Sequence, residues 1–455
     1  MQAGREIQED GAVQTGQEIQ EDGTMQAGQE MYEFAGKLFP IGRSLTGEGV
    51  RETLRLIKEQ VPELQIHEVP SGTKAFDWTV PKEWEIREAY IEDGQGRRIV
   101  DYGRNNLHVM GYSAPINRYL DLEELLSYIK VEENQPEVIP YVTSYYSQKS
   151  AFCMSKNQRD SLKPDTYHMV IDSRLFDGVL NYGEILLPGA SEKEVLLSTY
   201  ICHPSMANNE VSGPVLAVWL AKWLKSLDRR LSYRIVFVPE TIGSIVYLSR
   251  NLARMKERTI AGFVLTCVGD DRAYSYLETR KGDTLTDRVM RNVLGFAHPE
   301  YRTYSYLDRG SDERQYNAPG VDLPVCDFCR SKYAEYPEYH TSADDMTLIS
   351  PEGLEGSYEV MRQVLRALEY NRCYRVTCLC EPQLGKRGLY PSVSRKGIYE
   401  EVKKMTNLIA YADGTEDLIG VSTRIGVSVE ELIPIVDQLY EAGLLEVAEV
   451  CANRY

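Results

Sequence analysis

The chain has 455 residues, with 51 lysines and arginines against 68 aspartates and glutamates, so its formal net charge is −17. A surplus of this size disfavours nonspecific binding of the whole protein to nucleic acid or to an anionic membrane. Apolar residues make up 43% of the sequence and charged residues 26%, which excludes a fibrous or fully disordered chain. A single core rarely grows beyond about 250–300 residues, so we expect more than one domain.

The sequence carries no signal for export or for membrane insertion. No run of about 18 apolar residues occurs, and the first thirty residues lack the cationic start and apolar stretch of a signal peptide. Nine cysteines, an odd number scattered over the chain, are typical of reduced thiols rather than of a disulfide framework. We therefore expect a cytoplasmic protein without membrane partners.

The N-terminal third contains three different kinds of sequence. Residues 1–30 repeat a twelve-residue unit rich in Gln, Glu and Gly, which holds too few large aliphatic side chains to bury a face and predicts a disordered acidic tail. Residues 32–60 predict two helices with a break at 40–49. Residues 74–163 are rich in Trp, Tyr and Pro and contain short alternating runs such as 85–91, which predict a β-rich inserted domain.

The central part alternates between strand and helix patterns. Short apolar runs at 195–202, 233–239 and 263–268 are followed by helical patterns at 213–227, 244–258 and 283–296. This alternation predicts a doubly wound α/β sheet. Ser350 as N-cap and Pro351 at the first helical position signal one more helix, which closes an α/β domain formed by residues 31–73 and 164–374.

The C-terminal part predicts a connector and a small helical domain. Residues 375–395 are rich in Pro and Gly, and residues 396–455 give the outline helix, helix, turn, helix and short strand of a winged helix-turn-helix. From Glu401 to Tyr455 there are ten acidic and four basic side chains, and the presumptive recognition helix opens with Val429, Glu430 and Glu431. These charges disfavour DNA binding, so we expect this domain to contact a protein partner or a second copy of the chain.

Candidate functional residues follow the three central strands. In an open α/β sheet, ligands bind beyond the carboxyl ends of the strands, and the residues found there are His203, then Glu240, then Asp270 with Asp271. His340 lies in the polar loop before Ser350. Imidazole and carboxylate are zinc ligands, and a carboxylate beside a metal-bound water can act as general base.

The residues alone leave a structural alternative at each of these positions. A histidine such as His203 can simply be hydrogen-bonded at a helix N-terminus, and His340 can be a solvated loop residue. A carboxylate such as Glu240 can stabilise the start of the next helix.

Several long motifs resemble those of a known family. The segments STYICHPSMANNEVSGP, FVPETIGSI, LTCVGDD, RGSDERQY and EYHTSADD are similar to those of a bacterial aminopeptidase-like family with a β-rich insert and a C-terminal winged helix. That family is a distant branch of the zinc aminopeptidase superfamily, which includes glutamate carboxypeptidase and the transferrin receptor. The resemblance covers residues 31–455 and implies a mixed sheet of the zinc-aminopeptidase type.

The resemblance also implies roles for particular residues. His203 and His340 match zinc-binding histidines, Glu240 matches the general base, and Asp270 is the best match for the Asp ligand. Asn209 and Thr241 stand where the superfamily has metal-binding carboxylates, and Ser205 stands where it has an Asp that orients the first histidine. These replacements favour one zinc ion over two. Further metal ligands or supporting residues would be Asn209, Glu210 and Asp271, and substrate contacts would be Asp312 and Arg314.

Two further patterns have plainer explanations. Cys326 and Cys329 have metal-ligand spacing but no second pair at zinc-ribbon distance, so we interpret them as core residues. An aromatic series in the insert could form a stacking platform for a sugar or peptide, although the core of a small β domain explains it better; its members are Tyr141, Tyr145, Tyr146 and Phe152.

The sequence therefore predicts a zinc-dependent hydrolase that cleaves an amide bond in a small peptide or an amide-bearing metabolite. The alternative is a non-catalytic binding or scaffold protein with a degenerate metal site, which Asn209 and Thr241 motivate. A DNA-binding regulator is the third and weakest hypothesis.

Overall fold

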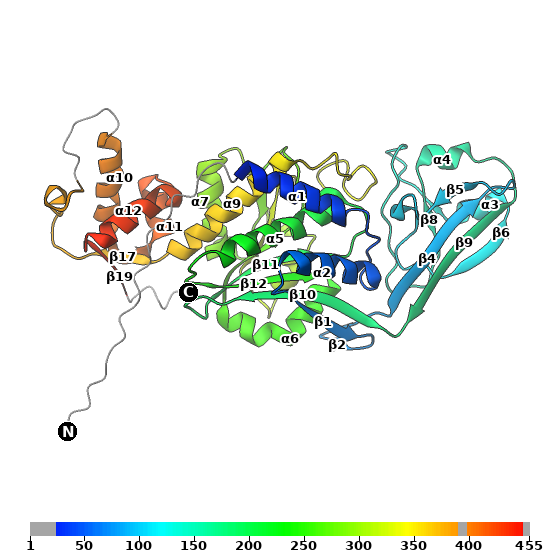
Figure 1. Cartoon of the computed structure of the whole chain (residues 1–455), viewed down its shortest axis with the longest axis horizontal. Coiled ribbons are helices and arrows are strands. Elements are labelled where there is room, and N and C mark those ends of the chain that lie inside the picture. The colour runs from blue at the N-terminus through cyan, green and yellow to red at the C-terminus, as the bar shows by residue number, and fades with distance from the viewer. Residues whose placement is uncertain (1–23, 390–397, 449–455) are drawn as a thin grey trace, which may run out of the picture.

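The computed structural model describes residues 24–389 and 398–448. Figure 1 shows three parts in a row along the longest axis: the winged helix, the central α/β domain and the β-rich domain. No helix in the described residues is long and apolar enough to cross a membrane. Most of the expected acidic tail, residues 1–23, lies outside the described residues, but residues 24–30 belong to a helix rather than to a tail.

That helix is α1 (Thr24–Leu38), and it lies on the outer helical layer of the α/β domain. Its Met31, Phe34, Ala35 and Leu38 are buried, and their spacing places them on one helical face. A Cβ at Gly28 would lie 2.4 Å from the carbonyl oxygen of Pro351. Glycine therefore permits the close approach of α1 to the start of α9, which orders residues that the repeat alone would leave unfolded.

The α/β domain is built on an eight-stranded mixed sheet in the order β1-β10-β12-β11-β13-β16-β14-β15. Strands β11, β12, β13 and β16 are mutually parallel; β10 runs antiparallel to both of its neighbours, and β14 runs antiparallel to β16 but parallel to β15. The strands are β1 (Gln65–Pro70), β10 (Val179–Leu187), β11 (Glu194–Tyr200), β12 (Ser232–Val238), β13 (Thr259–Leu265), β14 (Ser275–Leu277), β15 (Arg302–Tyr304) and β16 (Val325–Cys329). The predicted mixed α/β sheet is confirmed.

Alternate residues of the central strands feed two cores on opposite faces of the sheet. Leu197 of β11 packs into one core and Leu196 into the other. The first core also contains α1 and α2 (Glu48–Gln60), and the second contains α6 (Ile242–Arg258). The remaining helices of the first core are α5 (Ser212–Lys225), α7 (Leu285–Ala297) and α9 (Pro351–Tyr370). Both faces are covered, as a largely parallel sheet requires.

The β-rich domain is centred on a four-stranded antiparallel sheet in the order β5-β4-β9-β6. Its inner strand β9, which lies between β4 and β6, begins after residue 163, so the sheet extends beyond the expected end of the insert. The elements are β2 (Lys74–Ala75), β3 (Trp78–Thr79), β4 (Glu83–Glu92), β5 (Arg98–Asp101), β6 (Ile116–Leu120), α3 (Leu122–Ser127), β7 (Ile129–Lys130), β8 (Phe152–Cys153), α4 (Lys156–Ser161) and β9 (Tyr167–Phe176). Pro140 pairs with Thr341 in an isolated β-bridge, which joins this domain to the loop that carries His340.

The C-terminal domain is a winged helix. It has a three-stranded sheet, β18-β17-β19, whose strand β17 (Cys373–Val376) crosses the expected boundary at residues 374 and 375 between the α/β domain and the connector. The other elements are α10 (Ile398–Tyr411), β18 (Asp413–Asp417), α11 (Leu418–Ile425), α12 (Val429–Glu441) and β19 (Leu445–Val447). Cys373 is disulfide-bonded, so the expectation of reduced thiols is wrong at this residue, while the other seven described cysteines are free.

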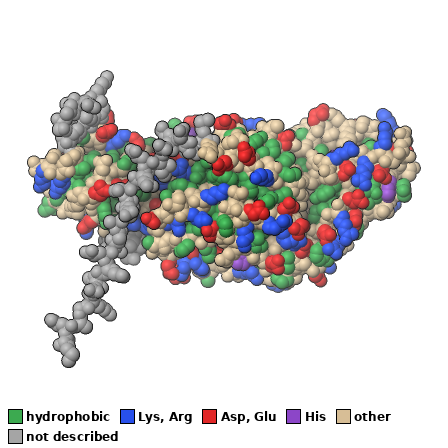
Figure 2. All heavy atoms as spheres, in the orientation of Figure 1, with side chains coloured by type: hydrophobic (Ala, Val, Ile, Leu, Met, Phe, Trp, Pro, Cys, Tyr) green, Lys and Arg blue, Asp and Glu red, His purple; other side chains and the backbone are tan. Residues whose placement is uncertain are grey.

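The presumptive recognition helix, α12, forms hydrogen bonds with α9 of the α/β domain. Glu430 accepts a 2.6 Å hydrogen bond from Arg366 of α9, and Asp437 accepts a 3.2 Å bond from the Tyr370 hydroxyl. Asn292 of α7 contacts Ser422 of α11 at 2.8 Å. On the face seen in Figure 2, acidic and basic side chains are interspersed rather than gathered by sign. The helix that would enter a DNA groove therefore packs against the α/β domain.

Candidate active site

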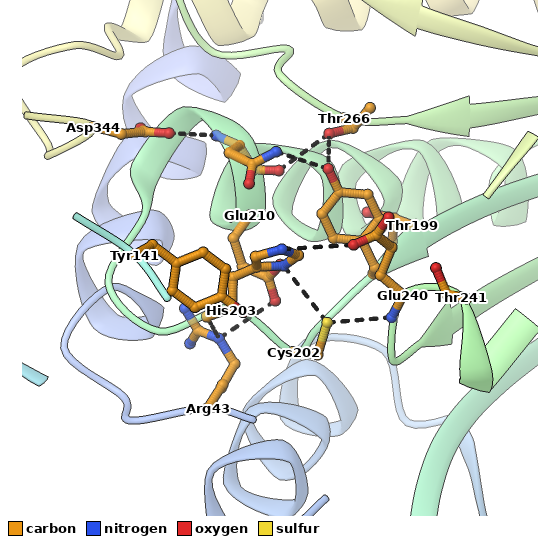
Figure 3. A network of polar contacts seen from close by, with 12 residues as sticks. Arg43, Tyr141, Thr199, Cys202, His203, Glu210, Glu240, Thr241, Thr266 and Asp344 are labelled. Atoms are coloured by element: carbon orange, nitrogen blue, oxygen red, sulfur yellow. Dashed lines mark hydrogen bonds and ion pairs between the residues drawn. The ribbon is translucent and has the colours of Figure 1, made fainter. Parts of the chain in front are cut away.

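The parallel strands direct a group of polar side chains to one edge of the sheet. His203 lies three residues after β11, Glu240 two residues after β12, and Thr266 directly after β13. His340 comes from the long loop between β16 and α9. The carboxyl ends of parallel strands meet at the same edge, which explains why residues so far apart in the sequence converge there (Figure 3).

His203 is buried and held from two sides. Its Nδ1 lies 2.8 Å from Oε2 of Glu210, and its carbonyl oxygen accepts a 2.9 Å hydrogen bond from Nε of Arg43. The same Arg43 Nε lies 3.5 Å from the other Glu210 oxygen. Burial lowers the pKa of His203 to about 3 and raises the pKa of Glu210 to about 8. The imidazole is thus neutral, and its Nε2 is left to face Glu240.

Glu210 comes close to His203 because the loop between them folds back. Residues Ala207–Val211 form a turn of π-helix ahead of α5, and this turn returns Glu210 to the histidine. Ser205, the position from which the resemblance expected support for His203, bonds to the carbonyl of Phe39 instead. Glu210 therefore orients the His203 ring, a role that a partner carboxylate commonly has for a ligating histidine.

Glu240 is the acidic group that faces His203. Its Oε2 lies 3.6 Å from Nε2 of His203, its Oε1 lies 3.7 Å from Nη2 of Arg314, and its backbone N–H donates to Sγ of Cys202 at 3.2 Å. Burial, together with the charge of Asp312, raises the pKa of Glu240 to about 8. Perturbed carboxyl groups of this kind are typical of catalytic acids and bases.

His340 completes the group from the opposite side. Its ring centroid lies 5.4 Å from that of His203. The ring centroid of Tyr141, from the β-rich domain, lies 5.1 Å from the centroid of each of these two rings. The backbone N–H of Tyr141 donates to the His340 carbonyl at 2.8 Å, and burial lowers the pKa of His340 to about 3. The two histidines are therefore uncharged and adjacent, and the ring of Tyr141 from the inserted domain packs against both.

The aromatic series in the insert divides between two roles. Tyr141 and Tyr145 join at the site, with their hydroxyl groups 3.1 Å apart. Phe152 is fully buried in a core, whereas Tyr146 is exposed. One part of the series is therefore core, as expected, and another part walls the site.

Asn209 belongs to a neutral hydrogen-bond network. Its side-chain nitrogen donates to the Tyr200 hydroxyl at 2.8 Å, and its backbone carbonyl accepts from the Thr266 hydroxyl at 3.1 Å. The Tyr200 and Thr266 hydroxyls are themselves hydrogen-bonded, and the Asn209 backbone N–H donates to Asp344 at 3.0 Å. The side chains of Asn209, Tyr200 and Thr266 on this side of the site are uncharged, and the Asp344 carboxyl group binds the backbone beneath them.

Asp270 is not brought together with the two histidines as a ligand set. Its carboxylate accepts hydrogen bonds from Asn208, Ser331 and Arg272. Strand β13 ends at Leu265, so Thr266 rather than Asp270 occupies the position directly after the strand. Asp271 is exposed. The expected His₂Asp combination is thus not assembled in the structure.

Asp312 and Arg314 lie beside Glu240. Asp312 is buried and accepts 2.7 Å hydrogen bonds from the Thr241 backbone and from the Ser244 hydroxyl, while Arg314 donates to the Thr241 side chain. Thr241 has a positive φ of 65°, a strained conformation for a β-branched residue. Asp312 therefore holds the turn that presents Glu240, and Arg314 lies between this turn and the Glu240 carboxyl group.

The donor atoms fit one zinc ion better than two. His203 and His340 supply two neutral imidazoles of the kind that bind zinc, with the Glu240 carboxyl group beside His203; the donor atoms of these three residues do not all lie within 4.8 Å of one another. The carboxyl group in the network around Asn209 and Thr266 is that of Asp344, which accepts the backbone N–H groups of Asn208 and Asn209. Among the described residues, one group of three metal-ligating types has its ligand atoms within 4.8 Å of one another, namely Cys202, His203 and Glu210. Burial raises the pKa of the Cys202 thiol well above its ordinary value, so this sulfur is protonated and a poor ligand.

Arg43, Tyr200 and Thr266 are site residues that no sequence pattern had indicated. Arg43 lies in the break between the first two helices, and Tyr200 lies within an apolar run. Thr266 could have been found from a more exact strand end, but nothing local marks Arg43. These residues reach the site only through tertiary contacts.

The fold and site together define an aminopeptidase-like α/β protein with a winged helix. Residues 32–371 match the family described as a domain of unknown function, DUF4910, and residues 372–447 match a winged helix-turn-helix family. The chain belongs to the DUF4910 family, which confirms the resemblance seen in the sequence.

Known relatives agree with this assignment. The chain is 42% identical over 417 residues to a Clostridium acetobutylicum protein named "putative polysaccharide biosynthesis protein with aminopeptidase-like domain", covering 91% of this chain and 95% of the relative. A crystal structure of a putative peptidase from the same organism is 41% identical, with a TM-score of 0.88 over 94% of this chain and 98% of that one. The zinc aminopeptidase BSAP of Bacillus subtilis has a TM-score of 0.56 at 13% identity, over 75% and 94% of the chains, which shows a shared fold alone.

Proposed function

We propose that this protein hydrolyses an amide bond in a small peptide or an amide-bearing metabolite, with one zinc ion as cofactor. The observation that supports this most strongly is the position of His203 at the carboxyl edge of the sheet, with its Nε2 3.6 Å from Glu240 and its ring centroid 5.4 Å from that of His340. The relative's name, which refers to polysaccharide biosynthesis, favours an amide on a carbohydrate, such as an N-acyl amino sugar, over a long peptide.

His203 and His340 would hold the zinc ion, with the Glu240 carboxylate beside them. When bound, zinc supplies Lewis-acid polarisation of the amide carbonyl and of a water molecule. Glu240 takes a proton from the attacking water and returns it to the leaving amine, the work of a general base and then a general acid. Arg314, 3.7 Å from Glu240, binds an electronegative group of the substrate, and Tyr141 shields the site from bulk water.

Zinc content and amide hydrolysis test this proposal together. Purified wild-type protein dialysed against zinc is expected to retain about one ion per chain, and His203→Ala and His340→Ala are expected to lose it because a ligand is missing. Asp270→Asn and the control His67→Ala, whose ring stacks on Tyr182, are expected to keep it. A wild type that retains no more zinc than the two histidine variants would refute the zinc site.

Glu240→Gln separates proton transfer from zinc binding. The amide side chain cannot accept a proton but still offers an oxygen, so zinc should stay while hydrolysis of aminoacyl anilides or N-acyl amino sugars falls about 10²–10⁴-fold. Equal activity in the wild type and Glu240→Gln would contradict the role of Glu240.

A second candidate function is a binding or scaffold role without catalysis. The neutral side chains of Asn209, Thr241 and Thr266, in place of charged metal ligands, favour it. In this case Glu240→Ala would leave the cellular phenotype intact, whereas a phenotype equal to that of a gene deletion would favour the hydrolase.

A further inference from the structure

A polar cavity lies beyond the end of β16, at the edge of the sheet that also carries the candidate active site. It has a volume of about 60 Å³ and is lined by residues 330–332, by Ala273, by Arg302 and Tyr304 of β15, and by Glu335 and Tyr336. One ordered water needs about 10–15 Å³ of such space. The cavity therefore has room for a small polyatomic group.

The lining of this cavity is cationic. Arg302, Arg330 and Lys332 face it, against one acidic residue, the exposed Glu335. Its formal charge is thus about +2, within a chain whose net charge is −17. A local surplus of positive charge attracts anions. In a chain that is acidic as a whole, such a surplus is not a consequence of the overall composition.

Two of the three cations are buried without a carboxylate in direct contact, although the charges of Asp270 and Asp271 act on Arg330 from further away. Arg330 is 4% exposed and Lys332 is 5% exposed. In the part of the chain that the structure describes, no carboxylate oxygen lies within 4.0 Å of a charged nitrogen of either residue. Buried Lys and Arg side chains are almost always paired with an acid, because desolvation of an unpaired charge is costly. Their missing partner points to a ligand.

The two buried cations are held in place by carbonyl groups and aromatic rings. Arg330 donates to the carbonyls of Ala273 at 2.6 Å and Gly353 at 3.3 Å, and its guanidinium stacks over the Tyr274 ring at 3.7 Å. Lys332 Nζ donates to the Tyr333 carbonyl at 3.2 Å and lies over the Tyr333 ring at 4.0 Å. The Lys332 ammonium has three donors, of which this contact uses one.

The cavity borders the candidate active site but is separate from it. Tyr336, which lines the cavity, donates through its hydroxyl to Asp344 at 3.1 Å. Asp344 in turn accepts the backbone N–H groups of Asn208 and Asn209. Neither His203 nor Glu240 lines the cavity.

We propose that this cavity is a binding site for a phosphoryl group, carried either by inorganic phosphate or by a small phosphate monoester. A phosphate dianion matches the formal charge of +2, and guanidinium groups bind its oxygens through paired hydrogen bonds. Lys332 supplies a further charge-assisted hydrogen bond from the cavity wall.

Calorimetric titration of the full chain with inorganic phosphate, at constant ionic strength against chloride, tests the proposal. The wild type is expected to bind one phosphate per chain in a saturable manner. Lys332→Met is expected to bind at least about 10-fold more weakly, because one charge-assisted hydrogen bond is lost. Lys163→Met, which removes an exposed cation of the distant β-rich domain, is the matched control and should bind like the wild type.

Two further variants keep the test decisive. Arg302→Gln changes an exposed side chain, so it remains informative if Lys332→Met does not fold, and it too should weaken binding. His340→Ala should bind phosphate normally, which separates this cavity from any phosphate held at a zinc ion. A titration with ethyl phosphate compares the ester with the free ion, and tighter binding of the ester would identify a phosphorylated metabolite as the source.

Three results would overturn the proposal. They are the absence of saturable binding of both probes to the wild type, wild-type affinity in both the Lys332 and Arg302 variants, and loss of binding in His340→Ala.

Discussion

Arg43 provides a sharp test of how the candidate site is held together. Its side chain is almost fully buried, donates to the carbonyls of His203 and Leu38 at 2.9 and 2.6 Å, and lies 3.5 Å from Glu210. Replacing it with methionine keeps much of the volume but leaves the Glu210 carboxylate buried beside an apolar side chain. We expect Arg43→Met to destabilise the α/β domain.

The expected size follows from the cost of breaking a buried ion pair, measured at pH 9, where Glu210, whose pKa is about 8, is ionised. Removal of one partner costs about 3–5 kcal/mol, and in a domain of this size about 1 kcal/mol lowers the melting temperature by about 2 °C. The calorimetric transition of the α/β domain should therefore fall by about 6–10 °C. Arg87→Met, which removes an exposed arginine of the β-rich domain, should leave this transition unchanged.

A double variant identifies the cause. Adding Glu210→Gln to Arg43→Met removes the unpaired carboxylate, so the double variant should be more stable than Arg43→Met alone. A loss below about 1 kcal/mol in the single variant, the size of an exposed pair, would refute the reasoning. So would a double variant in which the two losses simply add.

Two other predictions concern parts of the molecule outside the site. Asp327 on β16 is buried with neither carboxylate oxygen hydrogen-bonded, and burial and the neighbouring Glu313 raise its pKa well above the ordinary value. The folded state thus keeps a proton that the unfolded chain releases above about pH 3.9, so stability declines as the pH rises from there toward the folded-state pKa. Asp327→Asn should raise the melting temperature more at pH 8 than at pH 5, unlike the exposed Asp177→Asn, and an equal shift at both pH values would count against this. The docked helix α12 predicts that the full chain does not bind duplex DNA, and fluorescence anisotropy showing tight, steeply salt-dependent binding would contradict it.

The sheet could be predicted from the sequence because its strands are short apolar runs. The runs at 195–202 and 233–239 match β11 and β12 to within a residue or two at each end. The run at 263–268 predicted the end of β13 too late, because Cys267 and Val268 are fully buried in the loop after this strand. Burial continues there after strand pairing stops, so hydrophobicity alone placed the strand end too late and made Asp270 seem the residue that follows it.

The site could be predicted only in part, since its support depends on how the chain folds back on itself. His203 and Glu240 were candidates because each follows a predicted strand, and His340 because it lies in the polar loop before Ser350; the structure brings all three together. Whether Ser205 or Glu210 orients His203 depended on one turn of π-helix between them, which no periodicity in five residues can reveal. Arg43 and Tyr141 are 160 and 62 positions away from His203 in the sequence, and only the tertiary structure places them beside it.

The unusual arrangement of charge at this edge of the sheet connects the two proposed sites. The neutral network of Asn209, Tyr200 and Thr266 lies where a second metal ion would need carboxylates, so this edge lacks one source of positive charge that could bind an acidic substrate. Arg330 and Lys332 supply fixed positive charge at the neighbouring strand end instead, linked to the same loop through Tyr336 and Asp344. A protein side chain cannot polarise a carbonyl as a metal does, but it can bind a phosphoryl group. A single zinc ion and a cationic cavity, as proposed here, would therefore supply positive charge at two neighbouring places along this edge of the sheet.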